Sequence, residues 1–535
     1  MRLSRRQFIT SVGIAAAAGA VGATPARAER SRRLKFTYFV PRDGAMTPAP
    51  KESLQRVYLM DADYNPLRIA IRIGDQPGTL LLEEPGEPYK ITALDWVDGF
   101  GYVYLVADNG GPGYRPGEMP AEVLLNEQIA LSRMAGVAAA GQEAERAGVA
   151  LGGDYAERME KARSLLKSSG PSEAPESRAK AHWRALNEAL WAGEIVAVTR
   201  ARHAIAKRGP RPDFKFGAKA FGCLSQAEPY TRAFYDIFNY CTLPFYYRGF
   251  ESVKGKPAWQ RTDQMVEWCR KGNITPKGHP LMWFHEAGVP PWLEDKSFEN
   301  VRSLHEHRIR RIVSRYKGSI DYWDVINEAH EFANILHYTY DQLLDLTAMC
   351  CRTARKANPG CTSVVNSTMV WGEYAAPKAG QPLPDRLRRT PFQYVGDCIR
   401  QKMDFDVIGL QIYYPHRDMF EIDRMLERFG RLGKPVHITE QGIASDPSED
   451  PKSLVKKPWG QWHEPFSQKI QADFLEQMWT IAYSKDFLTA ITYWDFSDYG
   501  GHFWPHGGFL DADLKPKESY GRLKSLIDSW QGRTT

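Results

Sequence analysis

Short segments rich in β-branched and aromatic residues recur eight times after residue 211, and this recurrence restricts the possible folds more than any other feature of the chain. Helix-like or loop-like segments separate them. Strands that alternate with helices favour a parallel sheet, and eight such units favour closure into a (β/α)8 barrel, an α/β fold. The predicted strands are residues 219–225, 238–244, 278–284, 322–328, 362–368, 405–414, 435–441 and 490–496.

Two of these segments end at a glutamate. Residues 322–326 lead directly into Asn327 and Glu328, and residues 435–439 lead into Glu440. The carboxyl ends of the strands face the active site in a (β/α)8 barrel, so both carboxylates are expected there. Glycoside hydrolysis uses such a pair: a protonated carboxyl group releases the leaving oxygen, and an ionised one attacks the sugar. The pattern therefore predicts Glu328 and Glu440 as catalytic residues.

The chain before the barrel divides by composition into two regions. Residues 29–120 contain short, partly alternating runs between Gly, Pro, Asp and Asn turns, which predicts a small all-β, sandwich-like module. Residues 121–210 are expected to be a helical connector with a linker at 168–177, and residues 211–535 the catalytic domain. The aromatic residues of the module either offer carbohydrate a stacking surface or form a core that only braces the barrel; they are Tyr38, Trp96, Phe100, Tyr102 and Tyr104.

Residues 1–28 have the pattern of an export signal, with arginines, an apolar run at 14–23 and a small-x-small site that ends at Ala28. The sequence SRRQFI resembles a twin-arginine signal, although an arginine pair can also precede an apolar helix by chance. We expect export of the folded protein, to the periplasm or the medium, and removal of this segment. No other stretch approaches about 20 uninterrupted apolar residues, so no membrane partner is expected for the mature chain.

Composition argues against several other classes of function. A net charge of +6 is small beside 70 basic and 64 acidic residues and does not support nucleic-acid binding. The 7 cysteines lack a CxxC pattern, and folding in the cytoplasm before export would leave them mostly as buried thiols. No HExxH or comparable spacing occurs, so we expect neither a catalytic metal nor another cofactor. The histidines considered as ligands are His279, His285, His330, His416 and His502.

Four motifs in the second half of the chain carry a family resemblance. They are KGHPLMWFHEAGVPPWL, WDVINEA, PVHITEQGI and ITYWDFSDYGGHFW, in this order. Residues 216–520 thereby resemble glycoside hydrolase family 10, the endo-β-1,4-xylanases. The resemblance implies a retaining β-glycoside hydrolase that acts on a polysaccharide or oligosaccharide, with Glu328 as general acid/base, Glu440 as nucleophile and xylan as the default substrate.

The resemblance also implies a set of substrate-binding residues. Asn327 matches the Asn that hydrogen-bonds the 2-hydroxyl of the cleaved sugar. Trp494 and Trp504 match an aromatic platform, because the apolar face of a sugar stacks well on an indole, although core packing is the alternative for both. The remaining matches are His279, Trp283 and Gln411, with Phe284 and His285 competing for a further family His position.

Departures from the family pattern bear on the substrate. Phe245 and Arg248 stand near a family Asn and Lys that bind sugar, and Tyr413 replaces a His on the sixth strand. Arg248 either binds an acidic or sulfated substituent or pairs with a protein carboxylate such as Glu251. We therefore expect weak activity on plain linear xylan and better activity on a decorated or different β-glycan. A non-catalytic barrel that only binds glycan is the rival function, and the presence of both glutamates argues against it.

Overall fold

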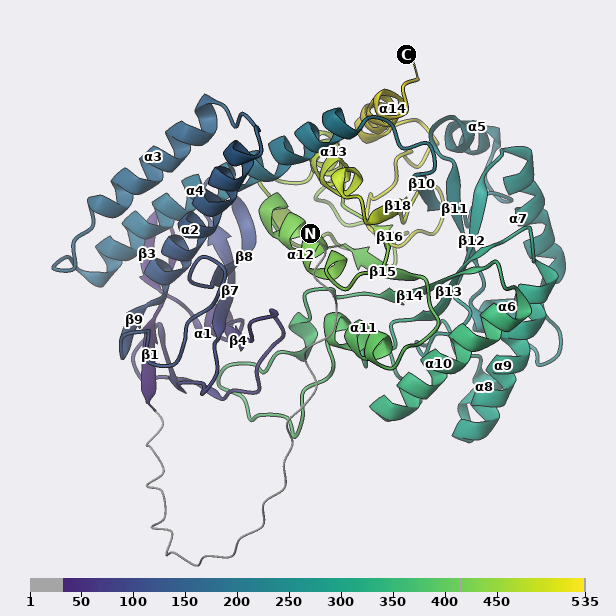
Figure 1. The fold of residues 1–535 in the computed structure, drawn as a ribbon, viewed down its shortest axis with the longest axis horizontal. Coiled ribbons are helices and arrows are strands. Elements are labelled where there is room, and N and C mark those ends of the chain that lie inside the picture. The colour runs from purple at the N-terminus through teal and green to yellow at the C-terminus, as the bar shows by residue number, and fades with distance from the viewer. Residues whose placement is uncertain (1–31, 414–415, 534–535) are drawn as a thin grey trace, which may run out of the picture.

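The computed structural model describes residues 32–413 and 416–533. Figure 1 shows a β-rich module on one side, helices that cover it, and a barrel surrounded by helices on the other side. The export signal predicted at residues 1–28 lies outside the described residues and stays a prediction. Within the described ranges, no helix combines the length and apolar character that crossing a membrane requires.

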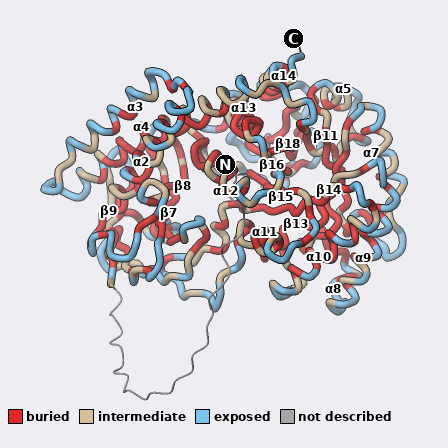
Figure 2. Tube along the Cα trace, in the orientation of Figure 1, coloured by how far each residue is buried: buried red, intermediate tan, exposed pale blue. Residues whose placement is uncertain are grey.

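Eight parallel strands close into a barrel in their order along the chain, which confirms the predicted (β/α)8 fold. Figure 2 shows the barrel strands among the buried segments, and all six residues of Val407–Ile412 are buried. Such strands read as continuous apolar runs because neither face of the sheet meets water. The strands are β10 (Lys215–Lys219), β11 (Tyr240–Pro244), β12 (Thr275–His279), β13 (Tyr322–Asn327), β14 (Thr362–Ser367), β15 (Val407–Ile412), β16 (Val436–Gln441) and β18 (Leu488–Tyr493).

Helices surround the barrel, and several begin at residues that satisfy free backbone N–H groups. At the start of Tyr340–Ala357, Thr339 and Gln342 form a capping box. Asp418 caps Met419–Gly430 by accepting from two backbone N–H groups. The longer helices are α5 (Glu228–Ile237), α7 (Trp259–Lys271), α9 (Phe298–Arg315), α10 (Tyr340–Ala357), α11 (Pro391–Arg400), α12 (Met419–Gly430), α13 (Gln468–Ser484) and α14 (Glu518–Trp530); the short ones are α6 (Tyr247–Phe250), α8 (Pro291–Glu294) and the 3-10 helix η1 (Glu373–Ala375).

Two barrel strands lie earlier in the chain than predicted. β10 ends at Lys219, where the predicted segment 219–225 begins, and turns follow it, with the N–H of Ser225 donating to the carbonyl of Gly222 at 3.0 Å. The apolar residues of that segment reflect loop packing, since Phe221 packs against Trp494. The second case is the predicted segment 278–284. β12 ends at His279, the second residue of that segment, because Pro280 comes next and has no N–H for the strand ladder.

Two four-stranded sheets form the N-terminal module, as predicted. One has the order β5 (Ile71–Ile73), β6 (Thr79–Glu83), β1 (Arg33–Thr37) and β9 (Glu122–Leu124). The other has the order β17 (Gln461–Trp462), β8 (Gly101–Ala107), β7 (Lys90–Val97) and β4 (Tyr58–Met60). A separate hairpin joins β2 (Phe39–Arg42) to β3 (Ala45–Pro48), and α1 (Lys51–Leu54) follows it. Because β17 follows β16 in the chain, the barrel part of the sequence completes the second sheet.

The aromatic residues of the module are mostly committed to protein contacts. Burial alternates along β8, as expected when one face of a sheet packs on a core. Tyr38 and Phe100 are buried in that core. Tyr104 lies under the guanidinium carbon of Arg417, 3.5 Å from its ring centre. These contacts favour the bracing role over an open stacking surface.

Three helices, α2 (Leu125–Arg146), α3 (Gly153–Lys167) and α4 (Pro175–Arg208), connect the module to the barrel. Residues 168–174 of the predicted linker are non-helical, whereas α4 begins at Pro175. Leu186 and Leu190 of α4 pack in the core of the module. At its other end, Arg208 donates to the carbonyl oxygens of Tyr483 and Ser484, where α13 ends. The 34-residue α4 thereby connects the two halves of the molecule (Figure 1).

Buried ion pairs hold the connector against the barrel. Arg133 on α2 donates to both carboxylate oxygens of Asp418, at 2.9 and 3.0 Å, and lies 3.3 Å from Glu421. The side chains of Arg133 and Asp418 are 3% and 0% exposed. On α4, Glu194 accepts from the backbone N–H of Met419 at 3.0 Å.

We expect Arg133→Met to lower the free energy of unfolding by about 3–5 kcal/mol, because it leaves the carboxylate of Asp418 buried without its cation. Urea unfolding followed by circular dichroism measures the change. Arg163→Met is the control, since Arg163 forms an exposed pair with Glu160 within α3 and its loss should matter little. Equal stability of the two variants would show that the buried pair does not hold the halves together.

Candidate active site

The strand that carries Asn327 ends in a strained turn. Asn327 is the last residue of β13, and the next residue, Glu328, has a φ of 56°, in the left-handed region. Residues other than glycine rarely adopt that region, and those that do are concentrated at functional sites. The backbone N–H of Glu328 donates to the carbonyl of Asn366 on β14 at 2.9 Å. This hydrogen bond holds the turn against the neighbouring strand.

Each carboxylate oxygen of Glu328 accepts a hydrogen bond from a side chain. Gln411 Nε2 donates to Oε1 and Trp283 Nε1 donates to Oε2, both at 2.9 Å. Gln411 Nε2 also lies 3.3 Å from Asn327 Oδ1. Four residues that the sequence predicted for the site are therefore in direct contact with one another.

Glu440 on β16 lies beside the same amide groups. Tyr413, one residue past the end of β15, donates its hydroxyl to Glu440 Oε2 at 2.6 Å. Asn366 Nδ2 donates to Glu440 Oε1 at 3.2 Å and to Asn327 Oδ1 at 2.7 Å. In the register of the two strands, Gln411 is the partner of Glu440. The side chains of Asn327, Asn366 and Gln411 thus bridge the two carboxylates.

Both carboxyl groups are nearly removed from water, at 6% exposure for Glu328 and 5% for Glu440. Burial raises the pKa of Glu328 to about 7. Burial also raises the pKa of Glu440 to about 8; the hydrogen bond from Tyr413 acts in the opposite direction, and the charge of Glu328 adds to the rise. Two carboxyl groups with raised pKa values near neutrality can hold and release protons, as acid/base catalysis requires.

A buried charged triad lies under Glu440. Lys277 Nζ and His279 Nδ1 lie 2.7 and 2.6 Å from Asp324 Oδ2. Although burial opposes it, the charge of Lys277 and the hydrogen bond from His279 lower the pKa of Asp324, so this carboxylate stays ionised and His279 Nδ1 carries the proton. His279 Nε2 lies 3.8 Å from Glu440 Oε1. The triad sets the tautomer and orientation of His279 beside the carboxyl pair.

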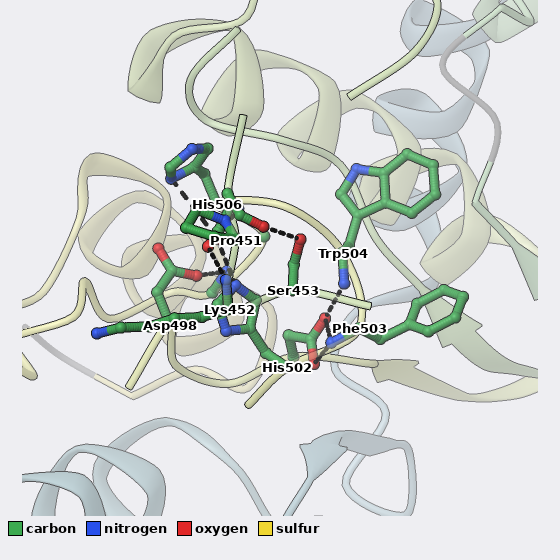
Figure 3. Close-up of polar contacts among 12 residues, drawn as sticks. Pro451, Lys452, Ser453, Asp498, His502, Phe503, Trp504 and His506 are labelled. Atoms are coloured by element: carbon green, nitrogen blue, oxygen red, sulfur yellow. Dashed lines mark hydrogen bonds and ion pairs between the residues drawn. The ribbon is translucent and has the colours of Figure 1, made fainter. Parts of the chain in front are cut away.

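The tryptophans expected as a platform lie at the site but are covered. Trp494 is 5% exposed and meets the ring of His279 edge to face at 5.2 Å. Trp504 is 2% exposed and stacks on Tyr413 at 6.0 Å. Its backbone N–H donates to Asp495 Oδ2 at 2.7 Å, as Figure 3 shows among the residues of this loop.

Trp283, which donates to Glu328, stacks on His285 at 4.4 Å with an interplanar angle of 13°. His285 is exposed, whereas Phe284 is buried against Tyr338 and His305. Of the two residues that competed for one family position, the structure therefore places His285 next to the site. Partial desolvation by the neighbouring groups lowers the pKa of His285, although the charge of Glu286 opposes this, and the ring stays mostly neutral near pH 7.

The segment after β11 differs from expectation. Phe245 points into the core, with its ring 4.9 Å from that of Trp323, so it does not line the site. Its neighbour Tyr246 does: its ring meets those of His279 and Trp283 at 5.4 and 5.6 Å. Burial raises the pKa of Tyr246, and the charge of Glu440 adds to the rise. A one-residue shift in the alignment exchanges the two side chains, because successive residues at a strand end point in opposite directions.

Arg248 lies on α6, is exposed, and donates to the backbone carbonyl of Glu286 at 2.9 Å. Among the described residues it forms no ion pair, so the predicted alternative of a pair with Glu251 is not observed.

Sequence reasoning missed several residues of the site. Asn366 is the next-to-last residue of β14 and is the register partner of Asn327, so a search for polar residues near strand ends would have found it. Lys219 ends β10 and donates to Asp495 Oδ1 at 2.5 Å. Lys277 and Asp324 lie inside strands, and no pattern in the sequence distinguishes their side chains from other polar strand residues.

Comparison with known proteins agrees with this geometry. The model of glycosyl hydrolase family 10 matches residues 224–525, more than half of the chain. The chain belongs to this family. Membership makes it a glycoside hydrolase and implies a polysaccharide substrate.

The similar proteins of known activity or structure share only a small fraction of identical residues with this chain. Endo-1,4-beta-xylanase B of Thermotoga neapolitana is 23% identical over 328 residues, 58% of this chain and 86% of that protein. Endo-1,4-beta-xylanase 1 of Arabidopsis thaliana is 24% identical over 285 residues, 51% of this chain and only 26% of that protein. Among solved structures, xylanase 10B from Thermotoga maritima has 19% identity and a TM-score of 0.47, over 62% of this chain and 99% of that one.

Proposed function

We propose that this family 10 hydrolase cleaves a β-linked, xylan-type glycan with retention of configuration, with Glu328 as acid/base and Glu440 as nucleophile. The observation that carries the proposal is the pair of buried carboxyl groups at the carboxyl ends of β13 and β16, joined by hydrogen bonds through Asn366, Asn327 and Gln411. Hydrogen bonds run from Glu440 through Asn366, Asn327 and Gln411 to Glu328, and this connected row supports a pair that acts on one sugar, as in a retaining enzyme.

The mechanism requires Glu440 to be ionised while Glu328 is protonated. In the substrate-free site the pKa of Glu440, about 8, lies above that of Glu328, about 7, which is the opposite order. Two interacting carboxyl groups titrate as a pair, so a single shared proton can lie on either of them. The 2.6 Å hydrogen bond from Tyr413 stabilises the charge on Glu440, and that charge keeps the proton on Glu328.

Hydrolysis of an oligosaccharide followed by proton NMR tests this assignment. The first product released should carry the β configuration at the new reducing end and convert slowly to the α form. An α product at the earliest time points would refute the retaining mechanism. A screen with xylo-oligosaccharides, other β-linked oligosaccharides and their acid-substituted forms would identify the substrate, and inactivity on all of them would favour the non-catalytic barrel.

Arg248 gives a second prediction on the substrate. Since it has no carboxylate partner in the described chain and its guanidinium is exposed, we propose that it pairs with an acidic substituent on the glycan. Arg248→Met should lower kcat/KM on the acid-substituted oligosaccharide by about threefold to tenfold and leave the neutral one unchanged. Arg270→Met, which alters an exposed pair on α7, is the control. This role would be refuted if wild type and Arg248→Met both preferred the neutral over the acid-substituted oligosaccharide, and to the same degree.

A further inference from the structure

Most of the exposed large apolar side chains lie in segments that follow barrel strands. Seven large apolar residues are exposed in the described chain, and only Leu131, on α2, lies outside the barrel region. Each of the others follows a barrel strand, and the loops after the strands form the active-site face of such a barrel. Exposed apolar residues concentrated on one face mark a binding surface. They are Leu224, Val253, Phe332, Leu454, Trp459 and Tyr499.

Trp459 is the most informative member of this set. All 15 tryptophans lie in the described residues, and Trp459 is the most exposed of them, at 38%. Its ring meets Trp504 edge to face at 5.3 Å. Trp504 in turn stacks on Tyr413, whose hydroxyl donates to Glu440. A continuous row of aromatic rings therefore leads from the proposed nucleophile to an exposed indole.

The loop that carries Trp459 is attached to the N-terminal module. Directly after Trp459, β17 adds to the edge of the module's sheet, with Gln461 opposite Tyr102 and Trp462 opposite Gly101. His463 follows, stacked on Trp191 of α4 at 4.2 Å and 2.9 Å from Glu194 Oε2. The module and the connector thus fix the position of this loop.

The same loop also holds the segment that contains Trp504. Asp450 Oδ2 lies 2.6 Å from His502 Nε2 and accepts from the backbone N–H of His506 at 3.1 Å. The backbone N–H of Leu454 donates to the carbonyl of His502 at 2.8 Å. Figure 3 shows Ser453, His502, His506 and Trp504 gathered in this arrangement. Trp459 and Trp504 therefore belong to one connected structure.

We propose that Trp459 is an additional sugar-binding residue, which stacks on a unit of the β-glycan chain beyond the cleaved bond, and that the N-terminal module serves to position it. The proposal rests on the proposed function. Because Trp504 is covered, Trp459 supplies the accessible indole surface at this end of the site. An exposed indole offers an apolar face to the C–H groups of a pyranose ring, and stacking there favours long substrates over short ones.

Trp459→Ala tests the binding role. On a series of β-linked oligosaccharides of increasing length, beginning with xylo-oligosaccharides, kcat/KM for the longest member should fall about fivefold to tenfold. Hydrolysis of the shortest active aryl glycoside should stay within twofold of wild type, and Trp459→Phe should recover most of the loss. Equal effects on short and long substrates, or no effect on either, would refute the role of Trp459. Inactivity of the wild type on every member would instead refute the proposed function.

Gly101→Ala tests the positioning role of the module. Gly101 has a φ of 129°, and a Cβ there would lie 2.8 Å from Gln461 O and 2.9 Å from His463 N, so the substitution must displace β17. It should reproduce the length-dependent loss of Trp459→Ala. Gly44→Ala is the matched control, since Gly44 has a φ of 77° in the same module but no atom within 4 Å of a Cβ. A folded Gly101→Ala with wild-type activity on the longest substrate would show that the module does not position Trp459.

Discussion

We expect Glu440→Ala to lower kcat by about 10⁴-fold to 10⁶-fold, because it removes the group that forms the covalent bond to the sugar. With an aryl glycoside that has a good leaving group, azide should restore turnover by entering the space left by the side chain. A single displacement then takes place, so the glycosyl azide should have inverted configuration. NMR of the isolated azide measures this.

Glu331→Gln is a suitable control for Glu440→Ala. Glu331 is also buried and lies near the site in sequence, but it pairs with Arg386 and does not touch the carboxyl pair. It should retain substantial activity and show no rescue by azide. A glycosyl azide of retained configuration from Glu440→Ala would identify Glu440 as the acid/base residue and reverse the assignment.

Glu328→Ala should behave differently, because it removes proton donation to the leaving oxygen. Substrates with poor leaving groups should lose about 10²-fold to 10⁴-fold in kcat/KM, whereas an activated aryl glycoside should lose far less. Azide should here give a product of retained configuration, since it attacks the glycosyl-enzyme formed with Glu440.

The pH profile gives an independent measurement on Glu328. The active form has Glu328 protonated and Glu440 ionised, so wild-type kcat/KM should be greatest between the two raised pKa values, about 7 and about 8, and should fall as the pH rises above them. In Glu328→Ala, assayed with the activated glycoside, that alkaline limb should be absent. An unchanged alkaline limb, or equal losses on activated and poor substrates, would show that Glu328 is not the acid.

Local sequence patterns were sufficient to predict the barrel and the position of the two glutamates at strand ends. Buried strands leave a contiguous apolar run, and Glu328 and Glu440 interrupt such runs at their carboxyl ends, where polar side chains face the site. Strand limits were less certain, because an apolar loop such as that at Phe221 resembles a strand when its packing partner is unknown. The exchange of Phe245 and Tyr246 has the same origin, since a one-residue register shift is invisible without the neighbouring strands.

The sequence by itself determined the (β/α)8 class, the family, and the position of the two glutamates at the ends of barrel strands, since each depends on motifs whose residues are close together in the chain. Only the tertiary structure decided which side chains surround them. Asn366 and Tyr413 reach Glu440 from other strands, and Lys277 reaches Asp324 in the same way. The attachment of the Trp459 loop to β8 joins residues about 360 positions apart. Contacts of this kind depend on how the barrel closes and how the module packs against it, and no local periodicity encodes either.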